Sequence, residues 1–428
     1  MAALSGFKWK SRHTVLAILF ITWLCSYMDR MVISTAIPYI AKDFKLSPVA
    51  MGAVMSVFFI GYSALQIPGG VLVDRFGARK LMLWSLGWWT VFTAITGVVN
   101  SLGPMMWVRT LFGAGEGVGV SSTYRVLANW FPPKERGTAT GIMLSSNSLG
   151  PALAPIIGAL LITWWGWRSA FYVLSVVGVV IMAIIYFGLQ EEPANKKGIT
   201  AEELAELKGE EVSAKVAGGE QYSFWQVFKT PVVWQCCIIF FLFDLTVGGV
   251  RTWLPTYLIR SRGFGLLQMG FSVSLPFFLG AVAYMLGGWL SDKYFPTRRK
   301  ILLVAAQWIS VICLYFTYTA KSAHWCVFWM TLLGFFLFVG MGAFWAVPMT
   351  SVSKAITGRA TSIVVLGGQI AGVVSPLIIG FLVQITGGGF NAGFQFMIAA
   401  TLLASLVALF VRGKREESGS EEYKSAHA

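Results

Sequence analysis

Long apolar segments recur along the whole chain, and they constrain its fold more than any other feature. Each is about 20 residues long, the length that a helix needs to cross a hydrocarbon core of about 30 Å. Hydrophobic residues make up 56% of the 428 residues and charged residues only 12%, whereas a soluble domain carries about 25% charged residues. The chain is therefore predicted to be an all-α integral membrane protein.

Twelve membrane-spanning helices are predicted from these segments. They lie near residues 14–36, 51–72, 82–99, 103–128, 139–163, 169–188, 232–258, 268–290, 301–320, 324–350, 360–385 and 392–411. Lys and Arg gather at the N-terminus and in the alternate loops near 75–80, 134–136, 293–300 and 354–359. Since basic loops stay in the cytoplasm, both termini are predicted to be cytoplasmic. This asymmetry also explains most of the net charge of +14, so no nucleic-acid partner is needed.

The chain divides into two similar halves. The apolar pattern stops between residues 189 and 230, which predicts an N-terminal six-helix half at 1–188, a cytoplasmic linker at 189–230, a second six-helix half at 231–412 and a cytoplasmic tail at 413–428. At a shift of roughly 220 residues, Gly52 matches Gly270, Pro155 matches Pro376, and the loop at 69–80 matches the loop at 287–300. Because an even number of spans separates the copies, the two halves are predicted to run parallel.

Four charged residues lie inside predicted spans. Asp29 and Arg30 interrupt the first span, and Arg109 and Glu116 the fourth, where each charge costs about 2.5–3.5 kcal/mol at the bilayer centre. Arg109 and Glu116 are seven residues apart, so they share one helix face about 10.5 Å apart, while the neighbours Asp29 and Arg30 diverge by about 100°. Such charges mark substrate or ion pathways, or else form structural ion pairs.

The loop at 69–80 resembles a family signature. Gly70-x-x-x-Asp74-Arg75-x-Gly77-x-Arg79-Lys80, with its degenerate copy at 288–300, is similar to the loop between the second and third helices of the major facilitator superfamily. The resemblance implies two halves that rock against each other, with Asp74, Arg75 and Arg79 forming a conformational latch through charge-assisted bonds between helix ends. The alternative is a basic loop that only sets the topology.

A narrower resemblance concerns the charged spans. Tyr27-x-Asp29-Arg30, the glycine-rich stretch from Arg109 to Gly117, and Asn129-Trp130-Phe131-Pro132 resemble the anion:cation symporter family, which includes bacterial sugar-acid importers, sialin and the vesicular glutamate transporters. This resemblance implies proton-coupled import of a small organic anion across the bacterial inner membrane by alternating access. A hexonate, hexuronate or aldarate is the substrate expected first. Import or exchange of dicarboxylic or aromatic acids is the alternative.

The resemblance also implies roles for the four charges. Arg30 is expected to bind the substrate carboxylate, Asp29 and Glu116 to carry protons, and Arg109 to tune them. The chemistry agrees with this division, because arginine offers a permanently charged fork that matches a carboxylate. The pKa of a carboxylate buried near arginine is set by competing desolvation and attraction, so its protonation can change.

Further residues are predicted to contact substrate, although helix packing explains each of them as well. They are Tyr27, Tyr62, Asn147, Trp345 and Gln369. Arg251, towards the outer end of the seventh span, stands where sugar-acid importers are expected to carry an uncharged residue. Two roles are predicted for Arg251. Either it contacts a second carboxylate of the substrate, or its charge is balanced by Asp244 or hydrated by solvent.

Enzyme chemistry has no counterpart in the sequence. There is no nucleophile elbow, nucleotide-binding loop or metal-ligand spacing, and the five cysteines lie in apolar spans. We therefore expect no enzymatic activity, cofactor or metal. A receptor would need a soluble output domain, for which only the linker and the tail offer residues. The expected partners are the organic anion, protons and membrane lipid, and the expected state is a monomer.

Overall fold

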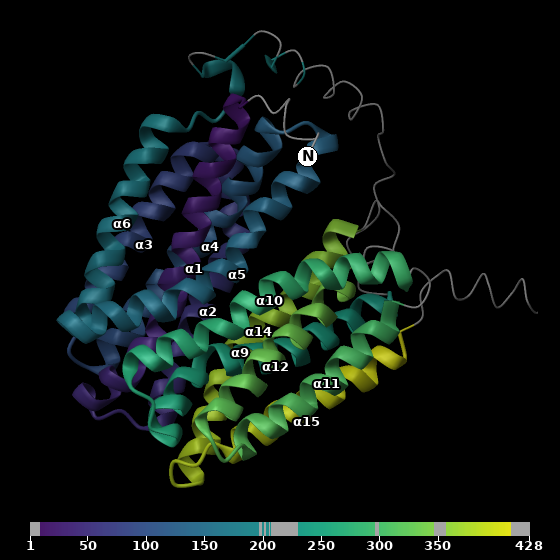
Figure 1. The fold of residues 1–428 in the computed structure, drawn as a ribbon. Helices are drawn as coiled ribbons and strands as arrows, with labels where there is room; N and C mark the ends of the chain where they lie inside the picture. Colours follow the sequence, from purple (N-terminus) through teal and green to yellow (C-terminus); the bar gives the residue numbers. More distant parts are fainter. Residues whose placement is uncertain are drawn as a thin grey trace, which may run out of the picture. The chain divides into compact units, whose positions relative to one another are not determined.

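Twelve helices of 19 residues or more run through the part of the chain that the computed structural model describes, which comprises residues 9–196, 199–200, 203–204, 206, 230–295, 299–345 and 357–411 (Figure 1). They are α1 (Ser11–Phe44), α2 (Pro48–Phe76), α3 (Ala78–Val98), α4 (Leu102–Trp130), α5 (Pro133–Trp165), α6 (Trp167–Gly188), α9 (Pro231–Arg262), α10 (Leu266–Tyr294), α11 (Arg299–Thr319), α12 (Ala323–Phe344), α14 (Thr357–Ile385) and α15 (Asn391–Leu409). A short 3-10 turn, η1, covers Pro193–Asn195. Each predicted span coincides with one long helix, which confirms the twelve-helix prediction.

Most helices extend beyond their apolar segments. The first span was predicted at 14–36, whereas α1 continues to Phe44, because hydropathy marks the lipid-facing middle of a helix and says little about its polar ends. The tenth was predicted at 324–350, but α12 ends at Phe344, and residues 346–350 lie outside the described part. Eleven of the described helices are long and apolar enough to cross a membrane. The other is α4, which carries the buried charges of Arg109 and Glu116. The protein is a multi-pass membrane protein.

Contacts divide the chain into two compact units. Unit 1 comprises Met1–Arg30, Ile60–Gly150 and Arg168–Gly218, and unit 2 comprises Met31–Phe59, Pro151–Trp167 and Gly219–Ala428. Boundaries fall inside α1, α2 and α5, so each of these helices contributes one segment to each unit, and another follows the first residue of α6. The division of the sequence at 188 and 231 stays a prediction.

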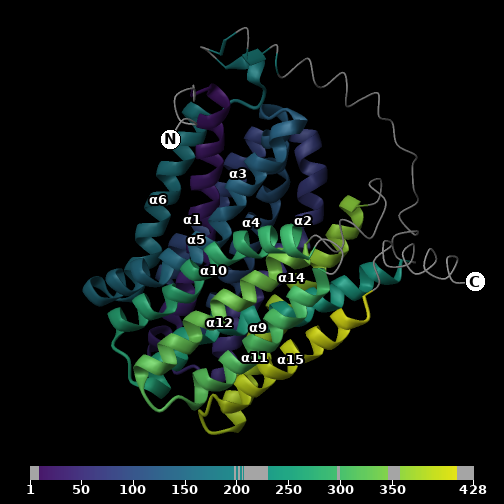
Figure 2. The ribbon, with the colours of Figure 1, turned by 45° about the vertical axis from the view of Figure 1, so that its right-hand side comes forward.

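Close helix packing in unit 1 depends on glycines of α4. The helices α3 and α4 lie side by side (Figures 1 and 2). A Cβ atom at Gly115 would overlap the Trp88 ring of α3, and one at Gly117 would overlap the backbone of Tyr62 in α2. Small residues let membrane helices approach in this way. The glycines of α4 therefore let α2 and α3 approach it closely.

Unit 2 contains two contacts that the internal repeat relates to each other. Gly52 of α2 packs against the carbonyl oxygen of Pro376 in α14, and Gly270 of α10 packs against that of Pro155 in α5. The sequence comparison matched the two glycines with each other and the two prolines with each other. The same glycine-to-carbonyl contact therefore occurs twice, with the repeats exchanging roles.

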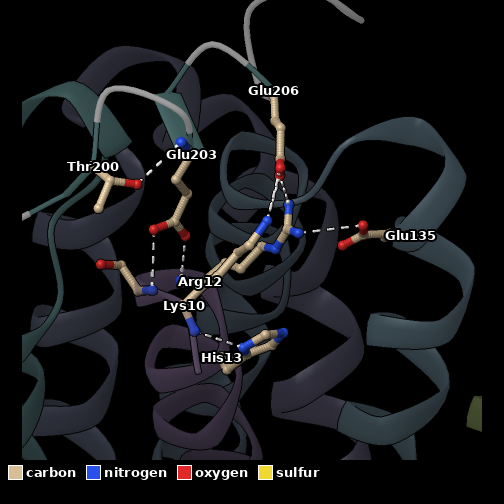
Figure 3. A network of polar contacts seen from close by, with 8 residues as sticks. Lys10, Arg12, His13, Glu135, Thr200, Glu203 and Glu206 are labelled. Carbon is tan, nitrogen blue, oxygen red and sulfur yellow. Dashed lines mark hydrogen bonds and ion pairs between the residues drawn. The ribbon is translucent and has the colours of Figure 1, made fainter. Parts of the chain in front are cut away.

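The N-terminus of α1 in unit 1 is capped by a residue that lies far along the chain. Glu203 accepts hydrogen bonds from the backbone N–H groups of Ser11 and Arg12, at 3.2 and 3.1 Å (Figure 3). The first N–H groups of a helix have no partner within it, and the helix dipole favours a carboxylate there. The segment after α6 thus supplies the cap that α1 itself lacks.

Ion pairs surround this cap. Lys10 Nζ lies 2.8 Å from Glu206, while Arg12 lies 3.2 Å from Glu206 and 3.4 Å from Glu135 in the first turn of α5 (Figure 3). Arg12 is buried, so these contacts are less screened by water than surface pairs. Glu203 and Glu206 of the linker therefore belong to unit 1, where they hold the start of α1 while Arg12 also contacts the first turn of α5.

Candidate functional site

A buried ion pair forms the centre of unit 1. Arg30 of α1 donates a hydrogen bond through Nε to Oε2 of Glu116 in α4; the Glu116 side chain is 0% exposed and that of Arg30 15%. Ser26, one turn before Arg30 on α1, donates to the other carboxylate oxygen at 3.1 Å. Both oxygens of Glu116 thus accept hydrogen bonds from side chains of α1, one of them charge-assisted.

Two aromatic rings enclose the guanidinium of Arg30. Its central carbon lies 4.9 Å from the centroid of Tyr27 and 4.6 Å from that of Tyr62, which belongs to α2. Both distances are within the range of cation–π attraction. Three residues predicted to bind substrate therefore meet in unit 1, and the rings hold the fork of Arg30 in place.

The other two charges of the spans complete one cluster. Asp29 and Arg109 are both buried, and Asp29 lies beside Thr93 of α3 and near Arg109 and Glu116. The Arg109 guanidinium also lies 4.5 Å from the centroid of the Phe112 ring. Two carboxylates and two guanidinium groups therefore balance one another when all four are charged, which lowers the cost of burying them.

Of the remaining substrate candidates, Asn147 lies in unit 1. It is exposed on α5, three residues before Gly150, which packs against Tyr27 of α1. Trp345 and Gln369 lie in unit 2, near Phe240 of α9. The Trp345 ring is 5.2 Å from that of Phe240, and Gly368, next to Gln369, packs against the Phe240 edge.

Phe240 was missed by the sequence analysis, because it lies in the apolar run IIFFLF, where no residue stands out. Arg251 lies 11 residues further along the same helix, about 16 Å away and on nearly the same face. Asp244 lies close enough to Arg251 for their charges to interact. Among the described residues, Arg251 Nε and Gln369 Oε1 are buried polar atoms without a hydrogen-bond partner.

Comparison with known proteins places this chain in a family. The model of the Major Facilitator Superfamily matches residues 19–371. The chain belongs to the major facilitator superfamily. The probable galactarate/D-glucarate transporter GarP of Escherichia coli is 32% identical over 94% of this chain and 95% of its own. The probable sulfoacetate transporter SauU of Cupriavidus necator is 31% identical over 94% of both chains, and the hexuronate transporter of Bacillus subtilis 29% identical over 94% and 95%.

A solved structure agrees with this superfamily fold. A bacterial homologue of the human lysosomal transporter Spinster, in an inward-facing and unoccupied conformation, is 19% identical and has a TM-score of 0.79 over 95% of this chain and 97% of its own. At this identity the likeness shows the fold alone. The superfamily and the relatives are transporters, so this protein is not an enzyme.

The loop that carries the superfamily signature makes two kinds of contact in unit 1. Asp74 lies 3.6 Å from Arg125 of α4, with side chains 73% and 56% exposed, and such an exposed pair contributes about 0–1 kcal/mol. Arg79 donates to the backbone oxygen of Tyr186 in α6 and lies over its ring, while Arg75 lies over the Phe76 ring. Arg125 was not predicted. The latch role of Asp74, Arg75 and Arg79 stays a prediction.

Proposed function

We propose that this protein is a proton-coupled symporter that imports a small organic anion, above all a sugar acid, across the bacterial inner membrane, with both termini in the cytoplasm. The observation that carries the proposal is the ion pair between Arg30 and Glu116, framed by Tyr27 and Tyr62. A substrate carboxylate and the Glu116 carboxylate compete for the same guanidinium fork.

This competition couples protons to substrate. When Glu116 takes up a proton, it loses its charge and its strong bond to Arg30, so the guanidinium becomes available to the substrate anion. When the substrate leaves, Arg30 again favours the charged form of Glu116, and the proton is released. Asp29, within charge range of Arg109 and Glu116, is the second proposed proton carrier, with Arg109 tuning both.

The electrical balance favours more than one proton for each anion. An inside-negative membrane opposes anion entry by about 2.3 kcal/mol for each charge and 100 mV. One proton with a monoanion makes transport neutral, and a second proton makes the membrane potential drive import. Two protonatable carboxylates in one cluster support this stoichiometry.

The names of the relatives support the substrate class. Galactarate, glucarate and hexuronates are sugar acids, and sulfoacetate is a small organic anion. The proposed substrate contacts besides Arg30 are Tyr27, Tyr62, Asn147, Trp345 and Gln369. The proposed latch consists of Asp74, Arg75 and Arg79, and the proposed state is a monomer.

Neutralising the proposed proton carriers tests the function. In proteoliposomes with an inward proton gradient, the wild type is expected to concentrate a sugar acid found by a thermal-shift screen. Glu116→Gln and Asp29→Asn are expected to abolish this accumulation and to retain counterflow exchange, which needs no net proton movement. Transport is measured with radiolabelled substrate.

Lys42→Gln is the control, since Lys42 is exposed at the end of α1, the helix that carries Asp29. It is expected to accumulate substrate within about twofold of the wild type, as is usual for exposed positions. If Glu116→Gln and Asp29→Asn both still concentrate substrate against its gradient, the proton assignment is wrong.

A dicarboxylic acid is the second candidate substrate. It is favoured by Arg251, which is half-buried and whose Nε has no hydrogen-bond partner among the described residues. Arg251→Ala is expected to weaken binding of an aldarate about tenfold, as for the loss of one charge-assisted hydrogen bond, and to leave a monoacid unaffected. Binding is measured by titration calorimetry, with Arg260→Ala at the exposed end of α9 as control. Equal losses for both acids would contradict a diacid-specific role.

A further inference from the structure

A small cavity adjoins Glu116 inside unit 1. Its volume is about 20 Å³, roughly the space that one water molecule needs. The lining comes from α1, α3 and α4. The lining residues with polar side-chain atoms are Thr22, Trp23, Ser26, Arg30, Ser85, Trp89, Glu116 and Thr123. A cavity of this size with several polar walls fits water better than an apolar guest.

The hydroxyl groups of the wall already donate their hydrogens to the protein. Thr22 donates to the carbonyl oxygen of Ile18 at 2.8 Å, Ser85 to that of Gly115 at 2.7 Å, and Thr123 to that of Gly119 at 3.3 Å. Ser26 donates to Glu116. Their oxygens are therefore left as acceptors for a guest, and a water molecule has two hydrogens to donate, enough for two of them, such as those of Thr22 and Thr123.

Two threonines of the lining lie on one side of Glu116 along their helices. Thr22 lies one turn closer to the start of α1 than Ser26, and Thr123 lies two turns closer to the end of α4 than Glu116. These helix ends are the ones that the basic loops place in the cytoplasm. Thr22 and Thr123 thus line the cavity on the side of Glu116 that is nearer to these helix ends.

We propose that this cavity binds one water molecule that relays protons between Glu116 and the cytoplasmic side, with Thr22 and Thr123 as its positioning residues. The inference rests on the proposed proton coupling at Glu116. On release, the O–H bond of the Glu116 carboxyl breaks and its proton joins the water. The water gives one of its own protons to the next acceptor on the cytoplasmic side. The water is unchanged, and Glu116 is left as a carboxylate that pairs with Arg30.

Thr22→Val and Thr123→Val test the relay, because valine keeps the shape of threonine and removes the acceptor oxygen. Proteoliposomes with an internal pH dye report substrate-driven proton movement, and radiolabelled counterflow reports substrate exchange. Each variant is expected to slow proton movement about tenfold, as for one lost hydrogen bond to the water. Counterflow is expected to stay within about twofold, since no net proton moves.

Two further variants separate the relay from a packing effect. Thr110→Val removes a hydroxyl that also bonds its own helix, to Met106 at 2.9 Å, but lies outside this cavity. It is expected to leave both readouts unchanged. Thr123→Ser keeps the acceptor oxygen and is expected to retain the wild-type proton rate.

The inference is overturned if Thr22→Val and Thr123→Val behave like Thr110→Val, or if counterflow falls by the same factor as proton movement. A wild type that moves substrate without protons overturns the proposed symport itself, and the relay with it. Wild-type coupling with unimpaired valine variants overturns the relay alone.

Discussion

Arg30→Ala is expected to lose binding of the substrate anion. Arg30 is the only proposed anchor of the carboxylate in unit 1, and its guanidinium is held by Tyr27, Tyr62 and Glu116. Removing one partner of a buried hydrogen-bonded charge pair costs about 2–5 kcal/mol, so affinity should fall by about 30-fold or more. Titration calorimetry or a thermal-shift titration with the sugar acid measures this loss.

A double variant separates binding from stability. Arg30→Ala leaves the charge of Glu116 buried without its arginine, which is costly. The pair Arg30→Ala with Glu116→Gln removes that charge, so it is expected to unfold at a higher temperature than Arg30→Ala alone and still not to bind. Arg30→Lys keeps the charge without the fork and is expected to bind weakly. Wild-type affinity in Arg30→Ala would contradict the assignment of the anchor.

Gly52→Val and Gly270→Val are expected to destabilise unit 2 to a similar degree. At each position a Cβ atom would overlap a backbone carbonyl, that of Pro376 or that of Pro155, and a backbone cannot swing aside as a flexible side chain does. Overpacking of this kind costs about 1–3 kcal/mol, occasionally more, which corresponds to a fall in Tm of several degrees. Tryptophan fluorescence during heating in detergent measures it.

Gly141→Val is the matched control. Gly141 lies in α5, as Pro155 does, and a Cβ atom there meets nothing within 4 Å. Its Tm is expected to stay close to that of the wild type. A large loss in one of the two glycine variants and none in the other would mean that the repeat-related contacts are not equivalent.

Properties that depend on local sequence were predicted correctly. Twelve helices followed from the length of the apolar segments, because a chain in lipid must satisfy its backbone groups within each segment. Repeat matching paired Gly52 with Gly270 before their common contact was known.

Other features depend on which segments meet. The sequence places Asp29 and Arg30 on diverging helix faces but does not say which of them contacts Glu116. The packing of α1 against α4 brings Arg30 into the ion pair with Glu116. Glu203 caps α1 across 191 residues of chain, and Arg125 reaches Asp74 from another helix. No local pattern identifies such partners.

The four charges inside spans show both sides of this division. The sequence by itself determined that they exist, that each is costly in lipid, and that Arg109 and Glu116 share a helix face, because these properties follow from hydropathy and helical periodicity. Only the tertiary structure decided that Arg30 pairs with Glu116 between two tyrosines, beside a cavity about the size of one water molecule. Helix packing sets these distances, and it depends on side chains that meet from distant parts of the chain.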